Sequence, residues 1–194
     1  VIVCYDRWGV YSSPRVWWMF KTMGHNNVYV LDGGLPSWIE NNFETNSIYF
    51  QSIKKGDFTA DFQEDWFADT QVMLNSINDR NKIIIDARSE GRFNGTSPEP
   101  RQGLRSGHIP NSKNLFFENV LDGTILKSKT ELKSIFEKLT NSTNENIFTC
   151  GSGITASILA FASTIAGFDN IKVYDGSWSE WGVDENLPIE KYLL

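Results

Sequence analysis

An internal repeat limits the fold of this chain more than any other feature. Residues 24–38, GHNNVYVLDGGLPSW, align with residues 167–181, GFDNIKVYDGSWSEW, at a constant offset of 143. The same offset sets residues 1–6, VIVCYD, over the strand-like run that leads into Cys150, and residues 12–20, SSPRVWWMF, over the helix-like run after it. The sequence therefore predicts one complete structural unit preceded by the second half of another copy.

Short apolar runs alternate with helical patterns through the complete unit. Strands are expected at 58–62, 82–87, 113–117, 146–149 and 171–174, and helices around 72–77 and at 128–139, 154–165 and 177–182. This alternation is typical of an α/β protein with a doubly wound parallel sheet flanked by helices. Ligands bind such sheets at the carboxyl ends of the strands, and Cys150 follows one of these ends.

The composition shift near residue 50 predicts the domain organisation. Residues 46–57 are polar and weakly periodic, which indicates a linker between the first unit, 1–45, and the complete, chemistry-bearing unit, 58–194. Because the chain opens directly on a core-like strand, we expect it to be truncated at its N-terminus, with any targeting segment lying before Val1.

Charge and cysteine content exclude several functional classes. A formal net charge of −6 and a pI near 5.0 argue against nucleic-acid and anionic-membrane partners, and no run reaches the about 20 apolar residues of a membrane span. Only Cys4 and Cys150 are present, without metal-ligand spacing, so neither a disulfide framework nor a metal site is expected. This cysteine usage favours a reducing compartment, the cytoplasm or the mitochondrion, with Cys4 as a buried apolar residue.

The stretch TCGSGITASILA, 149–160, places Cys150 in a glycine loop between a strand and a helix. Gly151 and Gly153 allow the backbone to curl so that several N–H groups point at one place, and the helix dipole adds positive potential there. The occupant of such a loop should be negatively charged, as a thiolate is. The pattern therefore predicts a nucleophilic cysteine.

Two other cysteine chemistries fit less well. A cysteine phosphatase needs an arginine six residues after the cysteine to grip phosphate, and Ala156 stands there. A Cys-His hydrolase needs a general base, for which His25 and His108 are the only histidines. His108 lies in the turn SGHIPNS, where a structural hydrogen bond is the favoured interpretation.

The stretch DARSEGRFNGTSPEPRQG leaves a predicted strand at its carboxyl end and gathers three arginines. Arg88 stands beside Asp86 and Glu90, which predicts a structural ion pair. An acidic protein has little need for arginines on such a loop for solubility alone.

Arg92 and Arg101 have no nearby partner other than Glu99. Their planar guanidinium groups suit the binding of a carboxylate in two parallel hydrogen bonds. From spacing alone, substrate binding and a structural role in the loop both remain open.

Four motifs in combination identify a family resemblance: CGSGIT, GRFNGTSPEPR, SGHIP and YDGSWSEW. Together they resemble the two-domain rhodanese-like sulfurtransferases, and among these the enzymes that use 3-mercaptopyruvate. Residues 1–45 resemble the catalytically silent first domain of that family. In the family this domain adds an acidic residue and a histidine to the cleft, from a stretch that would precede Val1.

The resemblance implies a role for each matching residue. Cys150 would take sulfur from the donor and become a persulfide, and the Ser152 hydroxyl would hydrogen-bond the substrate or the cysteine. Arg92 and Arg101 would hold the carboxylate and keto oxygens of 3-mercaptopyruvate. The backbone amides around the sulfur would be those of Gly151, Ser152, Gly153, Ile154 and Thr155. No cofactor is implied, and the sulfur acceptor would be a small thiol or a thioredoxin-like protein.

The loop also predicts the choice of donor. Members that use thiosulfate place basic residues just after the cysteine, whereas Gly151 and Ser152 are neutral, so 3-mercaptopyruvate is favoured. Two alternatives are a thiosulfate sulfurtransferase and a non-catalytic sulfur-carrier or regulatory module. The second would dock a partner through the open strand edges of the first unit and through Trp17 and Trp18.

Overall fold

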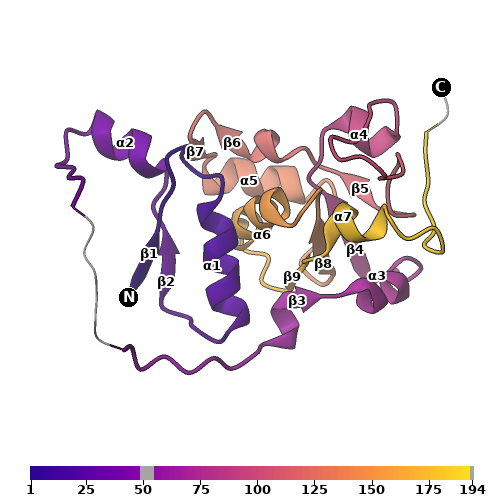
Figure 1. Cartoon of the computed structure of the whole chain (residues 1–194), viewed down its shortest axis with the longest axis horizontal. Coiled ribbons are helices and arrows are strands. Elements are labelled where there is room, and N and C mark those ends of the chain that lie inside the picture. Colours follow the sequence, from indigo (N-terminus) through magenta and orange to yellow (C-terminus); the bar gives the residue numbers. More distant parts are fainter. Residues whose placement is uncertain (49–54, 193–194) are drawn as a thin grey trace.

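The computed structural model describes residues 1–48 and 55–192. The complete unit is built on a five-stranded sheet in the order β3-β9-β8-β4-β5, and every pairing in it is parallel (Figure 1). The strands are β3 (Phe67–Ala68), β4 (Lys82–Asp86), β5 (Lys113–Asn114), β8 (Glu145–Thr149) and β9 (Ile171–Tyr174). The predicted parallel α/β architecture is confirmed.

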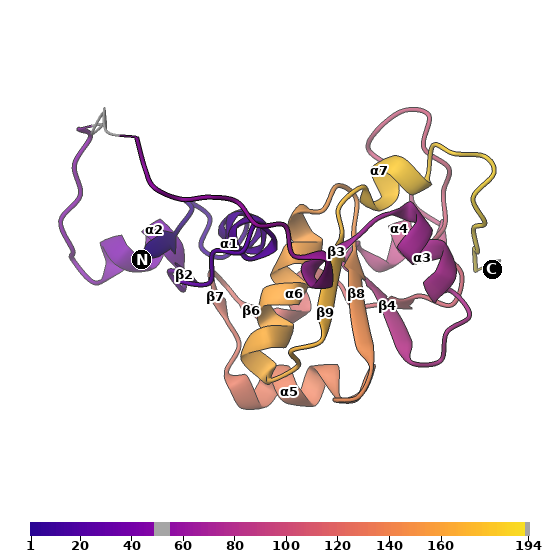
Figure 2. The ribbon, with the colours of Figure 1, turned by 90° about the horizontal axis from the view of Figure 1, so that it is seen from below.

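Helices cover both faces of this sheet (Figure 2). One face packs against α5 (Lys129–Phe136) and α6 (Ile154–Ala166), and the other against α3 (Thr70–Ser76) and α7 (Ser177–Trp181). Helix α4 (Glu90–Asn94) follows the carboxyl end of β4. Smaller elements are the 3-10 helices η1 (Glu64–Trp66) and η2 (Phe117–Val120) and the antiparallel hairpin of β6 (Leu121–Asp122) and β7 (Ile125–Leu126).

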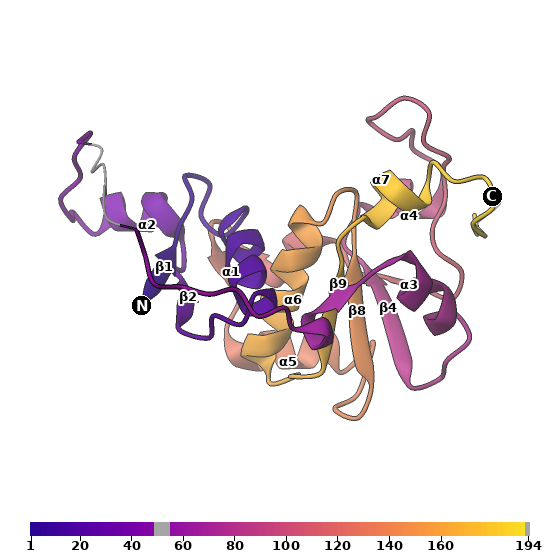
Figure 3. The same cartoon turned by 60° about the horizontal axis from the view of Figure 1, so that its bottom comes forward.

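Helix α6 is buried on almost all sides. The sequence predicts one apolar stripe along it, yet every residue from Ala156 to Ser163 is buried, including the serines. The reason is its position between the sheet on one side and α5 and the first unit on the other (Figure 3). Of the predicted stripe, Ile158 and Phe161 are buried, whereas Ile165 is 39 % exposed.

The first unit consists of β1 (Ile2–Cys4), α1 (Ser13–Thr22), β2 (Val28–Val30) and α2 (Gly34–Glu40). Strands β1 and β2 pair in parallel, and α1 packs against α6 of the complete unit. Trp17 meets Phe161 and Trp66 edge-to-face, and the Trp18 indole donates a hydrogen bond to the Trp66 carbonyl at 2.8 Å. Both tryptophans are 3 % exposed, so the prediction that they offer a docking surface is wrong. Both side chains pack between the two units.

The strand predicted at 58–62 is also wrong. This segment is extended and runs past α1 to β3 (Figure 3), but it pairs with no strand among the described residues. Its backbone instead satisfies the end of α1, because Asp61 and Gln63 donate to the carbonyls of Met23 and Thr22 at 3.1 and 2.8 Å. Phe58 packs edge-on against Phe20 and His25 at the end of α1, and Phe62 packs against Phe67 of β3. The strand predicted at 113–117 is shortened to β5, and residues 49–54 of the predicted linker lie outside the described residues.

The strand pairing refines the internal repeat. Ile2 pairs with Val28, whereas Ile171, which matches Val28 in the repeat, pairs with Asn146. Within this strand the offset is therefore 144 rather than the predicted 143. The segment that precedes α1, 5–12, is longer than the segment that precedes α6, 150–153, and this absorbs the difference.

In the corrected register Asp6 occupies the place that Cys150 has in the complete unit. The Asp6 carboxylate accepts four backbone hydrogen bonds, all between 2.8 and 3.0 Å, from Trp8, Tyr11, Ser12 and Ser13. The Ser13 hydroxyl donates a fifth at 2.9 Å. Burial favours the neutral acid, but these hydrogen bonds prevail and lower the pKa of Asp6 below its ordinary value.

This arrangement predicts a pH-dependent contribution of Asp6 to stability. Replacing Asp6 with Ala should lower the free energy of unfolding at pH 7 by about 1 to 2 kcal/mol, the range for a lost helix cap. Because the pKa is lowered in the folded state, the contribution is present above the unfolded-state pKa of about 3.9 and is lost as pH falls through the folded value. Urea unfolding at pH 7 and pH 3 checks this.

The matched control for Asp6 is Asp169→Ala, since Asp169 is exposed. Asp169→Ala should leave unfolding nearly unchanged at both pH values. If Asp6→Ala lost as much stability at pH 3 as at pH 7, the charged carboxylate would not be the stabilising group.

Candidate active site

Cys150 sits at the carboxyl end of β8, at the start of the loop that enters α6, and is 2 % exposed. Its Sγ accepts hydrogen bonds from the backbone N–H groups of Ser152 at 3.4 Å and Gly153 at 3.1 Å. Gly153 has φ +81°, a left-handed conformation that glycine adopts at little cost. The loop thus aims two N–H donors at one sulfur.

Of the five residues predicted to surround the sulfur, these two bind it directly. Gly151 lies between them and the cysteine, with its carbonyl accepting from Ser179 N–H at 2.9 Å. Ile154 and Thr155 are half-buried in the first turn of α6, and within the described residues their N–H groups make no hydrogen bond to Sγ.

Ser177 is a site residue that sequence reasoning missed. Its Oγ accepts the Cys150 N–H at 3.3 Å, lies 4.0 Å from Sγ and donates to the Tyr174 carbonyl at 2.8 Å. Ser177 has φ +51°, unusual for any residue but glycine, and in the repeat its counterpart Gly34 has the same φ. The complete unit thus accepts backbone strain and gains a hydroxyl beside the cysteine. The Gly-to-Ser difference between the repeats was the available signal.

Arg92 is the predicted substrate residue that the structure places at the Cys150 loop. A Cβ built on Gly151 would lie 3.0 Å from its Nη2, so the guanidinium lies directly against the loop there. Glu99, which is 2 % exposed, holds Arg92 with bonds of 2.6 Å to Nη2 and 3.2 Å to Nε. Arg92 itself remains 25 % exposed, so its free edge is open to a ligand.

Arg88 is fully buried and structural, as predicted, but with a different second partner. It pairs with Asp86 at 2.6 Å and with Glu99 at 2.9 Å, rather than with Glu90. Its guanidinium also stacks over the Trp178 ring at 4.1 Å. Because Glu90 begins the exposed turn of α4 while Glu99 is buried, only Glu99 can compensate a charge in this interior.

The other candidates lie apart from the sulfur. Arg101 is exposed on the 98–103 loop and makes no hydrogen bond or ion pair within the described residues. The His108 ring is buried, stacks on Phe93 at 3.9 Å and shares a hydrogen bond with the Phe93 carbonyl at 2.8 Å, which supports its structural interpretation. His25 packs edge-on among Phe20 and Phe58 at the end of α1.

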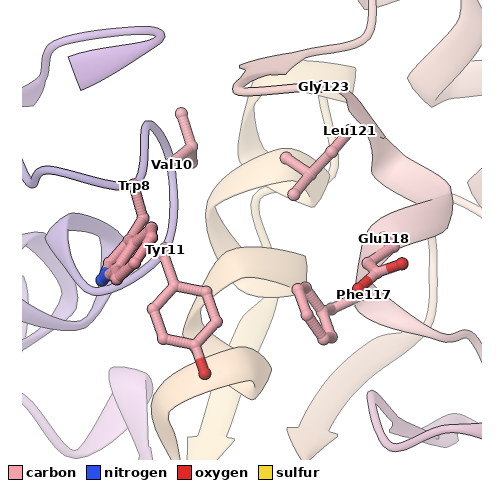
Figure 4. A pocket seen from close by; sticks show the side chains of 7 residues that line it. All are labelled: Trp8, Val10, Tyr11, Phe117, Glu118, Leu121 and Gly123. Carbon is pink, nitrogen blue, oxygen red and sulfur yellow. The ribbon is translucent and has the colours of Figure 1, made fainter. Parts of the chain in front are cut away.

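A cleft of about 630 Å³ lies between the Asp6 loop and η2 (Figure 4). It is lined by Trp8, Val10, Tyr11, Phe117, Glu118, Leu121 and Gly123. Tyr11 and Phe117 approach edge-to-face across it, with ring centroids 6.0 Å apart. Neither Cys150 nor Arg92 lines this cleft, so it is separate from the sulfur loop.

The family comparison accounts for this strand-cysteine-loop-helix arrangement. The profile described as Rhodanese-like domain matches residues 1–41 and 69–184, which is most of the chain. The chain belongs to the rhodanese-like domain family. Both parts of the internal repeat fall inside the two matched ranges, and the break between them contains the predicted linker.

Curated rhodanese-like relatives cover nearly the whole chain. It is 40 % identical to mouse 3-mercaptopyruvate sulfurtransferase over 93 % of its length, and 39 % identical to the mitochondrial thiosulfate/3-mercaptopyruvate sulfurtransferase 1 of Arabidopsis thaliana over 97 %. The solved structure of SseA from Escherichia coli, a 3-mercaptopyruvate sulfotransferase, superposes with a TM-score of 0.76 at 33 % identity, covering 92 % of this chain and 66 % of that one. The chain spans 62 % of the mouse protein and 56 % of the Arabidopsis protein.

Two further observations concern the described part of this rhodanese-like chain. Cys4 and Cys150 are both free and buried there, and burial raises the pKa of the Cys4 thiol. No described helix is long and apolar enough to cross a membrane, and no described cluster of three histidine, cysteine or acidic residues could hold a metal ion.

The crowding around the sulfur loop predicts the outcome of a glycine substitution. Gly153→Ala should destabilise the protein by more than the about 1 to 2 kcal/mol that a left-handed backbone costs a non-glycine residue. Its Cβ would lie 2.7 Å from Arg15 Nη1 and 3.1 Å from the Asp175 carbonyl oxygen. Urea unfolding measures the loss.

Gly103→Ala supplies the matched comparison, because Gly103 has φ +82° but no atom within 4 Å of the added Cβ. The difference between the two variants isolates the contact from the backbone strain. An equal loss of unfolding free energy in the two variants would show that the contact with Arg15 adds nothing to the backbone strain.

Proposed function

We propose that this chain carries the sulfur-transferring unit of a 3-mercaptopyruvate sulfurtransferase, with Cys150 as the sulfur carrier. The observation that carries the proposal is the cysteine loop itself. Two backbone N–H groups converge on Cys150 Sγ, and the next side chains, Gly151 and Ser152, bring no charge of their own. The names of the relatives support the same donor class.

The proposed first step begins with the Cys150 thiolate, which attacks the thiol sulfur of 3-mercaptopyruvate. A sulfur–sulfur bond forms as the carbon–sulfur bond of the donor breaks, and the electron pair of that bond leaves with the carbon as the enolate of pyruvate. A proton completes pyruvate, and Cys150 is left as a persulfide. A second thiol, small or on a thioredoxin-like protein, then takes the outer sulfur, and Cys150 leaves as thiolate.

In this proposal arginine side chains, rather than residues of the Cys150 loop, compensate the negative charge of the donor. Arg92, fixed by Glu99 against Gly151, is proposed to hold the carboxylate or keto oxygens of the donor. Arg101 is proposed as the second arginine that binds the donor; its exposed loop position requires it to move toward the Cys150 loop when a donor is bound. Ser152 is proposed to hydrogen-bond the donor or the cysteine from the open side of the loop.

The proposal includes the division of the chain into a silent half-domain at 1–45, a linker at 46–57 and a catalytic domain at 58–194. Asp6 supports this assignment, because a carboxylate in the place of the sulfur carrier cannot form a persulfide. A reducing compartment, cytoplasm or mitochondrion, follows from the need to keep Cys150 as a thiolate.

Thiosulfate is the second donor to consider, since the name of the Arabidopsis relative includes both donors. A dianionic donor is best served by cations directly after the cysteine, and this loop has none. The alternative of a non-catalytic docking module loses one of its two supports, because Trp17 and Trp18 are buried.

The persulfide is the most direct test of the proposal. Protein treated with 3-mercaptopyruvate should gain 32 Da, one sulfur, on the peptide that contains Cys150, and pyruvate should appear in equal amount. Cys150→Ser should gain no sulfur, whereas Cys4→Ser should react like the wild type. Absence of the added sulfur from folded wild-type protein would reject the proposal.

Donor choice tests the two arginines. Arg92→Ala and Arg101→Ala should each lower kcat/KM for 3-mercaptopyruvate roughly ten- to a hundredfold, since a charge-assisted hydrogen bond contributes about 1.5 to 3 kcal/mol. Turnover of thiosulfate should fall less. Arg80→Ala, which removes an exposed arginine on the loop before β4, is the control and should change neither donor. Unchanged 3-mercaptopyruvate kinetics in either variant would assign that arginine to the loop structure.

A further inference from the structure

The sulfur loop is flanked by guanidinium groups on both sides. Arg92 from α4 lies against Gly151, and Arg15 from α1 lies against Gly153, where its Nη1 would be 2.7 Å from an added Cβ. Gly153 is also the residue whose N–H binds Cys150 Sγ at 3.1 Å. A cation of the first unit therefore lies against the residue whose N–H binds the sulfur of the complete unit.

Arg15 is held in this position from two directions. Its Nη2 pairs with the Asp175 carboxylate, which follows the carboxyl end of β9. Its guanidinium also stacks over the Trp18 ring at 4.5 Å. Because Trp18 is buried between the units and Asp175 lies two residues before Ser177, Arg15 joins α1 to both loops that surround Cys150.

Only one of the two amino groups of the Arg15 guanidinium, Nη2, has a partner in the described part of the chain. Nη1 is buried and has no hydrogen-bond partner among the described residues. An unpaired buried donor costs free energy, so a purely structural arginine should have found an acceptor here. The group nevertheless faces the loop that closes on the sulfur.

We propose that Arg15 is a specificity-determining residue, which supplies a second positive charge to the Cys150 loop and so favours anionic reactants at this sulfur. The inference rests on the proposed function, for which the donor is an anionic thiol. Arg15 acts through charge across Gly153 and through its hold on Asp175, and it does not need to touch the donor. The first unit, although it has Asp6 in the place of Cys150, thus contributes to the choice of substrate.

Other charges near the loop are accounted for by their own partners. Asp175 opposes Arg15 directly and is 41 % exposed, so solvent weakens its charge more than that of Arg15, which is 23 % exposed. Arg92 is paired with Glu99, and Glu180 of α7 is bonded to the Thr70 hydroxyl. Arg15 with Asp175 is therefore the pair to vary.

Two alkylating reagents distinguish the effect of the Arg15 charge on Cys150 from an effect of Arg15 on the shape of the loop. Iodoacetate and iodoacetamide form the same bond, from Cys150 sulfur to a CH₂ carbon, and expel the same iodide, but only iodoacetate is anionic. The ratio of their rates at Cys150, followed by peptide mass spectrometry, reports the local potential. The fraction of cysteine present as thiolate cancels from this ratio.

Arg15→Gln should lower the iodoacetate-to-iodoacetamide ratio about threefold or more, as expected for one lost charge near a protein surface. Arg15→Lys should keep most of the ratio, and Asp175→Asn should raise it. Lys21→Gln removes a cation two turns further along α1 and should leave the ratio unchanged. With 3-mercaptopyruvate, Arg15→Gln should raise KM more than it lowers kcat.

An unchanged ratio in Arg15→Gln would overturn the inference, and so would an equal fall in Arg15→Lys. If Arg15→Gln does not fold, Asp175→Asn and Arg15→Lys still decide the matter. The iodoacetate-to-iodoacetamide ratio can be measured without any turnover of a donor. If the wild-type protein formed no persulfide, the proposed function would be rejected, and the ratio would still test the role of Arg15.

Discussion

A tight turn from strand to helix leaves several backbone N–H groups without partners, and in each unit of this fold one side chain accepts their hydrogen bonds. In the complete unit the acceptor is Cys150 Sγ, and in the first unit it is the Asp6 carboxylate. In the complete unit a left-handed glycine and the guanidinium groups of Arg15 and Arg92 lie at the same turn. The geometry that stabilises the turn is thus the geometry on which the proposed reactivity of Cys150 rests.

A chain of alternating charges connects the protein interior to this turn. Asp86, at the end of a central strand, binds Arg88, which binds Glu99, which binds Arg92 beside the loop. Two negative and two positive charges balance in this chain, so removing any one of the first three would leave the buried cluster with a net charge. Arg92 is consequently rigid, and a rigid guanidinium loses less freedom when it binds an anionic ligand.

Local patterns predicted the elements, and contacts between distant segments decided the rest. The runs at β4, β8 and β9 and the cysteine loop were legible because strand hydrophobicity and glycine turns are short-range features. The segment 58–62 misled, since alternating aromatics are typical of a half-buried strand, whereas Phe58 and Phe62 both remain about half exposed here. Glu99 as the partner of Arg88, and Arg15 at Gly153, depend on loop closure and on packing between the units, which no spacing rule contains. Ser177 was visible only by comparing the repeats.

Asp6 gives the first unit a fixed charge where the complete unit has a changeable one. A thiolate can be protonated, alkylated or oxidised, and each event alters what the surrounding N–H groups bind. The carboxylate undergoes none of these reactions under cellular conditions, so the hydrogen bonds that fix the loop before α1 do not depend on the state of a sulfur. Because α1 packs directly on α6, the helix that follows Cys150 is supported by a neighbour whose own turn is closed by a carboxylate, and oxidation of the sulfur would leave that support intact.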